Sequence, residues 1–347
     1  MPVFTVETTL PAPPPEPQNA TAGVAFLHVP SHVVLGWGER DFLIVFGIPS
    51  VDLDERRRRR DLQRSTCWQF PGVATRRNNF SGAMLVLYVL AQHPLHNYTY
   101  SAEALKEVAE WHDVVTLAMN EGSPTTTKRV GGRGFWGNEA EIGMSRKTFM
   151  WFDLAYRMFP NVSYIAKGDD DMFIRVPQYL ADLRSLPRHG LYWGFFVRST
   201  VQRGETKFRF RYAAGTCMTL ARDVVHQFVS YKPLQRLVHL PYSREREAEF
   251  FSLNMNHEDM MVGRVLAETR YPNLVVALEG WCRFHNVHVG IPIRPVTQYS
   301  VVVHHLWESE YSMFMRRFGK DVAPGPYRFR RNRKGLIRFI CDRRHLR

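Results

Sequence analysis

The segment YIAKGDDDMFI (164–174) places three consecutive carboxylates inside a pattern that is otherwise typical of a buried strand. Adjacent carboxylates repel, and burying one of them without a partner costs several kcal/mol. On extended backbone residues i and i+2 share a face, so Asp169 and Asp171 point one way and Asp170 the other. Two oxygen donors on one face suit Mg²⁺ or Mn²⁺. The alternative is an Asp-rich turn that caps the next helix, and the triplet alone does not separate the two.

Strand-like and helix-like segments alternate around this stretch. Apolar runs rich in β-forming residues occur at 41–48, 84–90 and 113–117. Helical spacing or helix-start signals occur at 55–65, 101–111, 143–158 and 177–186. This order predicts an α/β domain with a mixed, mainly parallel central sheet, in which ligands bind at the carboxyl ends of the strands.

Composition and charge bound the domain and its partners. Residues 1–40 are Pro-rich and aperiodic, which predicts a tail or stem remnant, and the globular part spans 41–318. Residues 319–347 are predicted to form a basic tail. The chain has 347 residues, with 46 Lys and Arg against 33 Asp and Glu, a net charge of +13 that favours anionic partners. Part of this excess is the five-arginine run at 56–60, whose first four residues we expect to face solvent.

Cysteines and glycosylation signals bear on the compartment. The four cysteines contain no Cys-x-x-Cys pair, and their number neither demands nor excludes disulfides. Four Asn-x-Ser/Thr sequons, at Asn19, Asn79, Asn97 and Asn161, favour a secretory lumen. No apolar run approaches the roughly 18 to 20 residues that a membrane helix needs. We therefore expect either a cytosolic chain or one whose anchor is missing from its start.

Two further clusters could join the triplet. Glu258 and Asp259 open an apolar helix, where carboxylates often only complement the helix dipole, although a carboxylate beside a metal site also suits a general base. The run VVVHHLW (301–307) ends an apolar strand with two histidines. A buried histidine more often satisfies the backbone than a metal, but an acidic site that needs further ligands favours a metal-binding role.

In this order the motifs resemble those of glycosyltransferase family 31, the β-1,3-galactosyl- and β-1,3-N-acetylglucosaminyltransferases. The segment RDLQRSTCW (60–68) is similar to the family's Arg-x-x-x-Arg-x-Thr-Trp motif, with one extra residue before the Trp. The segment KGDDDMFI (167–174) is similar to its Lys-Thr-Asp-Asp-Asp-Val-Phe-Val block.

Three motifs later in the chain extend the resemblance. The segment YAAGTCMTLARD (212–223) resembles the family's Tyr-Cys-Ser-Gly-Gly-Gly-Tyr-Val-Leu-Ser stretch, with Gly replaced at two positions. EDMMVG (258–263) resembles Glu-Asp-Val-x-x-Gly, and Val303-His304 resembles the Val-His that closes the domain. The match covers roughly residues 41–318, and its motifs are specific as an ordered set rather than singly.

The resemblance implies a GT-A-like fold and an inverting hexosyltransferase that uses Mn²⁺ or Mg²⁺. Such an enzyme moves galactose or N-acetylglucosamine from a UDP-sugar to a glycan or glycoconjugate hydroxyl in β-1,3 linkage. The motifs also resemble those of the kinetoplastid UDP-galactose- or UDP-N-acetylglucosamine-dependent enzymes, and the basic surface would suit an anionic acceptor. Family members are type II membrane proteins of the Golgi apparatus, so the resemblance implies a lumenal location and an anchor that this sequence does not show.

Matching the motifs residue by residue assigns roles in the expected site. The expected metal ligands are Asp171, Asp169 and His304. The residues expected to bind the nucleotide sugar are Arg64, Asp169, Asp170 and Gly215. Inversion requires in-line attack by a deprotonated acceptor hydroxyl, for which Asp259 is the expected base and Glu258 its helper or structural partner.

Two other classes of function remain open. Net charge and the arginine run suit a nucleic-acid-binding protein, but no zinc-finger, RNP-type or homeodomain-like pattern occurs and the triplet stays unexplained, so we expect no nucleic-acid partner. A metal-dependent phosphohydrolase could share the acidic metal site. Mn²⁺-dependent retention on UDP-agarose favours the transferase, whereas salt-dependent binding of unrelated RNA, or UDP release without sugar linked to an acceptor, favours a rival.

Overall fold

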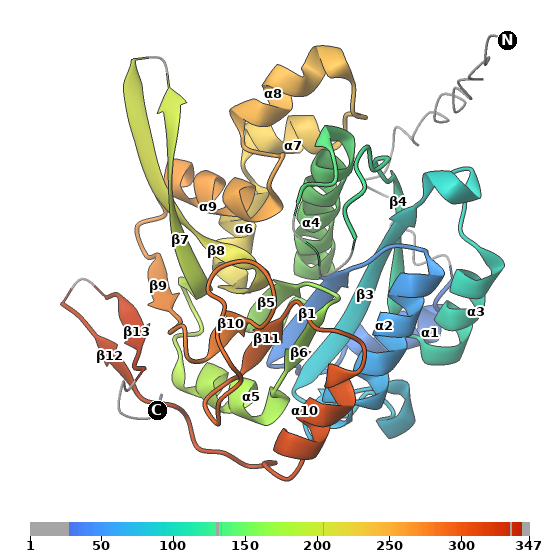
Figure 1. Cartoon of the computed structure of the whole chain (residues 1–347), viewed down its shortest axis with the longest axis vertical. Coiled ribbons are helices and arrows are strands. Elements are labelled where there is room, and N and C mark those ends of the chain that lie inside the picture. The colour runs from blue at the N-terminus through green and yellow to red at the C-terminus, as the bar shows by residue number, and fades with distance from the viewer. Residues whose placement is uncertain (1–27, 130–131, 133, 204, 334, 342–347) are drawn as a thin grey trace, which may run out of the picture.

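The structure is a computed structural model that describes residues 28–129, 132, 134–203, 205–333 and 335–341. A large twisted sheet crosses the molecule, and helices cover both of its faces (Figure 1). The helices are α1 (Ser31–Gly38), α2 (Asp54–Ser65), α3 (Ala102–Trp111), α4 (Asn138–Met158), α5 (Val176–Ser185), α6 (Arg222–Val229), α7 (Lys232–Val238), α8 (Glu247–Ser252), α9 (Glu258–Thr269) and α10 (Glu310–Phe318). Short 3₁₀ turns occur at Cys67–Gln69, Arg76–Asn78, Pro94–His96 and Arg244–Arg246.

The described strands form a ten-stranded sheet and a three-stranded sheet. The large sheet has the order β12-β13-β9-β7-β8-β5-β1-β3-β2, and β4 also pairs with β3. Its strands are β1 (Ile44–Pro49), β2 (Val73–Ala74), β3 (Met84–Gln92), β4 (Val114–Asn120), β5 (Tyr164–Gly168), β7 (Leu191–Arg203), β8 (Thr206–Ala221), β9 (Val275–Leu278), β12 (Phe329–Arg331) and β13 (Ile337–Phe339). The small sheet has the order β10-β11-β6 and consists of β10 (Phe284–Asn286), β11 (Val302–His304) and β6 (Met172–Ile174).

Most strand pairs of the large sheet are parallel. Antiparallel pairing is confined to β5 with β8, β7 with β8, and β12 with β13. The mixed, mainly parallel α/β fold is therefore confirmed, and the segments predicted from apolar runs and helical spacing correspond to β1, β3, β4, α2, α3, α4 and α5.

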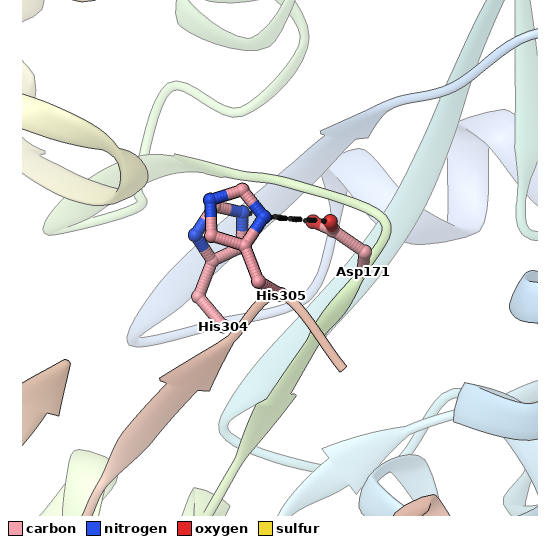
Figure 2. Close-up of side chains that lie close together, drawn as sticks. All are labelled: Asp171, His304 and His305. Carbon is pink, nitrogen blue, oxygen red and sulfur yellow. Dashed lines mark ion pairs between the residues drawn. The ribbon is translucent and has the colours of Figure 1, made fainter. Parts of the chain in front are cut away.

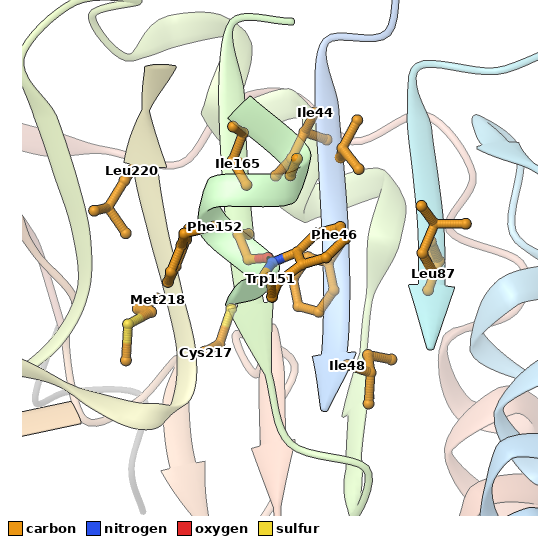
Figure 3. Packing of buried hydrophobic residues seen from close by; sticks show 14 of the residues in the cluster. Ile44, Phe46, Ile48, Leu87, Trp151, Phe152, Ile165, Cys217, Met218 and Leu220 are labelled. Carbon is orange, nitrogen blue, oxygen red and sulfur yellow. The ribbon is translucent and has the colours of Figure 1, made fainter. Parts of the chain in front are cut away.

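The core is built around β1, which is buried along its whole length. On one face Gly47 makes room for α4, because a Cβ at this position would lie 2.0 Å from the Trp151 ring. Trp151 Nε1 donates to the Ala166 carbonyl of the neighbouring strand at 2.9 Å, and Figure 3 shows this ring against β1 and β5. On the other face the Phe46 ring meets Tyr179 of α5, with centroids 6.1 Å apart. Helices thus lie on both sides of the strand that leads to the carboxyl edge.

The predicted N-terminal tail is too long. Residues 1–27 lie outside the described residues, but residues 31–38 form α1, whose Trp37 is fully buried and packs edge-on against Phe80 at 5.6 Å. The boundary at residue 41 is therefore wrong for the described part. The helix follows Pro30 and is only two turns long, so its pattern is too short to separate from the Pro-rich segment before it.

The prediction of a basic C-terminal tail is also wrong for the described residues up to Cys341, which form part of the fold. Strand β13 joins β9 in parallel, β12 pairs with β13, and a disulfide links Cys282 to Cys341. The Phe339 ring lies over Trp193, with centroids 5.9 Å apart. In β13 Ile337 and Phe339 are buried and Arg338 between them is exposed, whereas in β12 Phe329 is half-buried and both arginines are exposed, so the sequence resembles a charged tail.

Reduction of this disulfide should destabilise the domain, because the bridge closes a separation of 59 residues. We expect a reductant, or the Cys282→Ser/Cys341→Ser pair, to lower the free energy of unfolding by about 2 to 4 kcal/mol in denaturant titrations. The double variant serves as the control, since it should not respond to the reductant. Identical unfolding midpoints of the unaltered protein with and without reductant would contradict the prediction.

Candidate metal centre

The acidic triplet fills the turn between the two sheets. Strand β5 ends at Gly168 and β6 begins at Met172, so the prediction of extended backbone through the triplet is wrong. The alternative, an acidic turn, describes the backbone, although a strand rather than a helix follows directly. Gly168 is required at the start of this turn, because a Cβ there would lie 2.4 Å from the Met172 methyl group and 2.7 Å from the Phe46 ring.

The directions of the three side chains nevertheless follow the prediction. Nε2 of His304 lies 2.8 Å from Asp171 Oδ1 and 3.1 Å from Asp169 Oδ2. Asp170 points elsewhere and accepts a hydrogen bond from Ser50 at 2.8 Å. The turn therefore presents its first and third carboxylates to one histidine and its second to the end of β1.

Strand β11 delivers two histidines to this turn. It runs antiparallel to β6, with His304 opposite Met172, so the strand ends beside Asp171. The next residue, His305, has a left-handed φ of 60°, and its Nδ1 lies 3.3 Å from Asp171 Oδ2. Figure 2 shows both imidazole rings beside the Asp171 carboxylate. Asp171, His304 and His305 each offer one possible ligand atom, and these three atoms all lie within 4.8 Å of one another.

A second layer orients His304. Its Nδ1 lies 2.9 Å from Asn286 Oδ1 on β10 and 3.2 Å from Thr216 Oγ1 on β8. The asparagine oxygen can only accept, so Nδ1 carries the proton in that hydrogen bond and Nε2 faces the carboxylates. Burial disfavours a charged imidazole, but Asp171 and Asp169 outweigh this and raise the pKa of His304 to about 10. In this charge state the imidazolium neutralises part of the acidic cluster.

The donor set fits a divalent cation. Carboxylate oxygens and imidazole nitrogens are donors that Mn²⁺ accepts. Among the described residues, the buried Nδ1 of His305 meets Asp171 at 3.3 Å as an ion pair but forms no hydrogen bond of good geometry. Asp171, His304 and His305 could hold the ion with Asp169 beside them, once His304 Nε2 loses its proton. The predicted set Asp171, Asp169 and His304 is brought together, and His305 is an addition whose only signal in the sequence is its place after His304.

Arg56 forms an ion pair with the second carboxylate of the triplet. Its Nη1 donates to Asp170 Oδ1 at 2.5 Å, and its side chain is 15% exposed. Arg59 is also buried and donates to the Leu306 carbonyl at 3.0 Å. The prediction that 56–59 only face solvent is therefore wrong for these two residues. Helix α2 starts directly after β1, so its first turn lies over the carboxyl edge of the sheet, where the triplet is.

Arg64 lies away from the triplet, contrary to its predicted role at the nucleotide. It is buried, and its Nη2 lies 2.7 Å from both Asp113 Oδ1 and Glu107 Oε1. Eight residues of helix separate it from Arg56, a rise of about 12 Å along the axis. Arg64 is thus a structural cation of the α2–α3 interface. The sequence motif alone could not show that Arg56 and Arg64 have different partners.

Lys167 connects the triplet to α9. Its buried ammonium group donates to Asp169 Oδ1 at 2.5 Å, to Glu258 Oε1 at 2.8 Å and to the Gly215 carbonyl at 3.0 Å. The lysine therefore fixes the first turn of α9 beside the acidic turn. Sequence reasoning recorded Lys167 only as part of a motif, because its partners come from segments about 50 and 90 residues away.

Gly215 and Asp259 lie together at the edge of this cluster. The Gly215 N–H donates to Asp259 Oδ2 at 3.2 Å, and a Cβ on Gly215 would lie 2.4 Å from Glu258 Oε1, so a larger residue here would displace that carboxylate. Burial and the adjacent Glu258 charge raise the pKa of Asp259 to about 8, although hydrogen bonds from the Met260 and Gly215 amides lower it. Asp259 is thus a carboxyl that changes its charge near neutral pH.

A cavity of about 190 Å³ brings these groups to one surface. The acidic and histidine side chains that line it are Asp169, Asp170, Asp171, Glu141, Glu258, His304 and His305. Arg56, Lys128 and Trp136 also line it, with the Arg56 guanidinium 5.6 Å and the Lys128 ammonium 4.8 Å from the Trp136 ring centroid. Asp259 and Gly215 are not among the lining residues. The volume is below the roughly 300 Å³ of common ligand pockets, so a larger ligand would extend beyond the mouth.

A larger cavity of about 1160 Å³ lies beside α2 and contains Arg64, Trp111 and Asp113. It contains none of the carboxylates or histidines of the metal centre. Size alone favours this cavity as a binding site, but the residues that suit an ion lie in the smaller one, which we take as the functional site.

No protein-family model matches the sequence, and no curated protein matches it. Among solved structures, the chain is similar to mouse xyloside xylosyltransferase 1 in its apo form, with 8% identity and a TM-score of 0.36, over 76% of this chain and 97% of that one. It is also similar to a glycosyltransferase involved in the glycosylation of the major capsid of PBCV-1, with 11% identity and a TM-score of 0.29, over 79% of this chain and 98% of that one. The function is inferred below from the residues of the site.

Proposed function

We propose that the protein is a metal-dependent glycosyltransferase of the GT-A type that moves galactose or N-acetylglucosamine from a UDP-sugar to a glycan hydroxyl. The β-1,3 linkage and inversion follow from the resemblance to family 31. The observation that supports this is the convergence of Asp169 and Asp171, two histidines and the Lys167–Glu258 pair on one cavity. A divalent cation held by these carboxylates would neutralise the charge that develops on a diphosphate leaving group.

In this proposal the donor lies across the cavity. Asp171, His304 and His305 hold Mn²⁺ or Mg²⁺, with Asp169 in support. Arg56 replaces Arg64 as the cation for the nucleotide part, since it lines the cavity and Arg64 does not. Asp170 fixes Arg56 through their ion pair, and its second oxygen is held by Ser50.

Acceptor activation is assigned to Asp259. An inverting transfer needs a base that takes the proton of the acceptor hydroxyl as that oxygen attacks opposite the leaving group. A pKa of about 8 gives Asp259 the proton affinity that such a base needs near neutral pH. Glu258 is held by Lys167 and acts as a positioning residue, and Gly215 lets both carboxylates approach β8.

The compartment is proposed to be the Golgi lumen. The disulfide suits an oxidising compartment, and the sequon residues Asn79, Asn97 and Asn161 are exposed, whereas Asn19 lies outside the described residues. None of the described helices combines the length and hydropathy of a membrane span. The anchor expected from family 31 stays a prediction.

A pair of arginine variants tests the assignment of the nucleotide cation. We expect Arg56→Gln to weaken Mn²⁺-dependent UDP binding by roughly tenfold or more, because it removes a charge-assisted contact at the cavity. Arg64→Gln should lower the free energy of unfolding and leave UDP affinity of the folded fraction unchanged, since its partners are Asp113 and Glu107. Calorimetry with UDP and Mn²⁺ measures both, and the opposite pattern would restore Arg64 to the donor site.

A panel of UDP-sugars tests the proposed reaction. Purified protein is incubated with UDP-galactose or UDP-N-acetylglucosamine, with Mn²⁺ or with EDTA, and with or without glycan acceptors. We expect release of UDP from one of the two donors, only with Mn²⁺, and sugar linked to the acceptor. UDP or sugar phosphate released with no sugar linked to any acceptor would favour the phosphohydrolase, the second function that such a metal cluster supports.

A further inference from the structure

The hairpin of β7 and β8 carries a cationic face. The hairpin extends beyond the rest of the sheet (Figure 1), and its register places Arg198 opposite Arg211, Thr200 opposite Arg209 and Gln202 opposite Lys207. Side chains alternate along a strand, so these six share one face, which we call the cationic face. It holds four cations, and Glu205 lies in the turn beyond it.

The four cations of this face have no partner in the described part of the chain. No ion pair or hydrogen bond joins Arg198, Lys207, Arg209 or Arg211 to a described carboxylate, and all four residues are exposed. Like charges directly opposite each other in an antiparallel pair destabilise it, which applies to Arg198 and Arg211. A ligand with its own negative charges would remove that repulsion.

The opposite face anchors the hairpin to the catalytic region. It contains Phe208, Phe210 and Tyr212, and α9 packs against it, because a Cβ at Gly263 would lie 2.3 Å from the Tyr212 Cβ. The guanidinium of Arg264 lies 6.0 Å from the Phe208 ring centroid. The cationic face is therefore held outward by the helix that begins with the proposed base.

We propose that the cationic face binds an extended anionic polysaccharide, as part of the acceptor of the proposed transferase. This rests on the proposed function. Alternate residues of a strand are about 6.8 Å apart, so the face offers charges at regular intervals to a polymer that carries regular charges. Tyr212 lies on the opposite face at the base of the hairpin, where burial and the charges of Asp259 and Glu258 raise its pKa to about 12, so this end of the hairpin adjoins the proposed base.

Two other polyanions fit this face less well. Single-stranded nucleic acid is held by stacking on aromatic side chains. Phe208, Phe210 and Tyr212 lie on the face packed against α9, and Phe196, next to Arg198 on the cationic face, is half-buried with its ring edge-on to Tyr192. A membrane surface is bound by apolar side chains that insert beside the cations, whereas Thr200 and Gln202 lie opposite Arg209 and Lys207 here. Polar side chains beside cations suit a sulfated, phosphorylated or carboxylated glycan.

The test compares heparin binding by two variants of the full chain. The first combines Arg198→Thr, Arg209→Thr and Arg211→Thr, in which threonine keeps a high strand propensity and the like-charge pair is removed, so we expect an unchanged or raised thermal midpoint. The control combines Lys106→Gln, Lys232→Gln and Lys320→Gln, which removes the same charge from exposed sites elsewhere. Calorimetry with heparin at several salt concentrations reports affinity, and neutral dextran serves as the uncharged polymer.

We expect the hairpin variant to bind heparin on the order of tenfold more weakly than the unaltered protein near physiological salt, with a slope of log affinity against log salt reduced by about 2 to 3. The control variant should differ from the unaltered protein by less than about twofold. Equal losses in both variants, no heparin binding by the unaltered protein, or tighter binding to a single-stranded oligonucleotide or to anionic vesicles would overturn the proposal.

Mn²⁺-dependent UDP binding, measured on the same samples, separates this proposal from the proposed function. The hairpin variant should retain it, because the cavity residues are unchanged. If the unaltered protein binds heparin through the hairpin but shows no Mn²⁺-dependent UDP binding, the transferase assignment fails, the acceptor role fails with it, and the polyanion site alone stands. If UDP binding is normal and heparin binding is unaffected in the hairpin variant, only the hairpin proposal fails.

Discussion

Asp171→Asn should abolish Mn²⁺-dependent binding of UDP, with a loss in affinity of at least about 100-fold. Asp171 would supply an oxygen ligand to the proposed cation, and it also lies 2.8 Å from His304 Nε2 and 3.3 Å from His305 Nδ1, so its charge acts on both histidines. Asparagine keeps the shape of the side chain and removes the charge. Calorimetric titration with UDP, with and without Mn²⁺, measures the effect.

Asp61→Asn provides the matched control for this experiment. Its carboxylate is 54% exposed and pairs with Arg64 at the far side of α2, so the same chemical change should leave Mn²⁺-dependent affinity unchanged. Metal-dependent UDP binding that persists in Asp171→Asn, in protein with a normal thermal midpoint, would remove Asp171 from the ligand set.

The charge state of His304 adds a pH dependence to the same prediction. In the metal-free protein its pKa is raised to about 10, so below that pH the imidazole is protonated and Mn²⁺ must displace the proton. Asp171 stays ionised in this range, because His304 holds its pKa well below the usual value in spite of burial. We therefore expect Mn²⁺ affinity to rise between about pH 6 and pH 8, by up to about tenfold per pH unit. An affinity independent of pH would contradict a histidine ligand.

Asp259→Asn should abolish transfer while retaining Mn²⁺-dependent UDP binding, because the base acts on the acceptor and not on the donor. A positioned base contributes about 10² to 10⁴ in rate. In the unaltered protein kcat/KM should rise with pH up to about 8, since burial and Glu258 raise the pKa of Asp259 to about 8 and only the ionised carboxylate can accept the proton. The pH profile of transfer measures this limb directly.

Glu258→Gln separates the roles of the two neighbouring carboxylates. Removing the Glu258 charge lowers the pKa of Asp259, so the rising limb of the profile should move to lower pH while transfer persists. Near-normal transfer by Asp259→Asn together with inactive Glu258→Gln would reverse the assignment. Glu258, which lines the cavity and is bound by Lys167, would then be the base.

The sequence predicts the central layers of the fold well, for a physical reason. Strands β1 and β3 are buried on both faces and so appear as continuous apolar runs, which few other elements do. The C-terminal strands β12 and β13 could not be predicted, since each has only three residues and their arginines are exposed. Helix α1 was beyond prediction because two turns carry too little periodicity.

The residues of the candidate site also differ in how well the sequence predicts them. Asp169, Asp171 and His304 belong to local motifs, and the structure brings them together. Which of Arg56 and Arg64 is the cation for the nucleotide depends on their separation along α2 and on the partners of each. The spacing of arginines in the sequence does not show these partners.

The roles of His305 and Lys167 depend on tertiary structure as well. His305 returns to Asp171 only because its backbone adopts a left-handed φ of 60°. Lys167 acquires its role from Gly215 and Glu258, which lie far from it in the chain. The sequence therefore predicts part of the cluster, and the tertiary contacts define which other residues belong to it.

Release of UDP from UDP-galactose and UDP-N-acetylglucosamine tests the proposed metal-dependent donor site most directly. It is measured with Mn²⁺ and with EDTA, for the unaltered protein and for Asp171→Asn. A metal-dependent UDP-sugar transferase built on this cluster predicts release from at least one donor with Mn²⁺, none with EDTA, and none from the variant. Absence of Mn²⁺-dependent release from both donors, or equal release by Asp171→Asn, would contradict the assignment of the acidic turn and its histidines as the donor site.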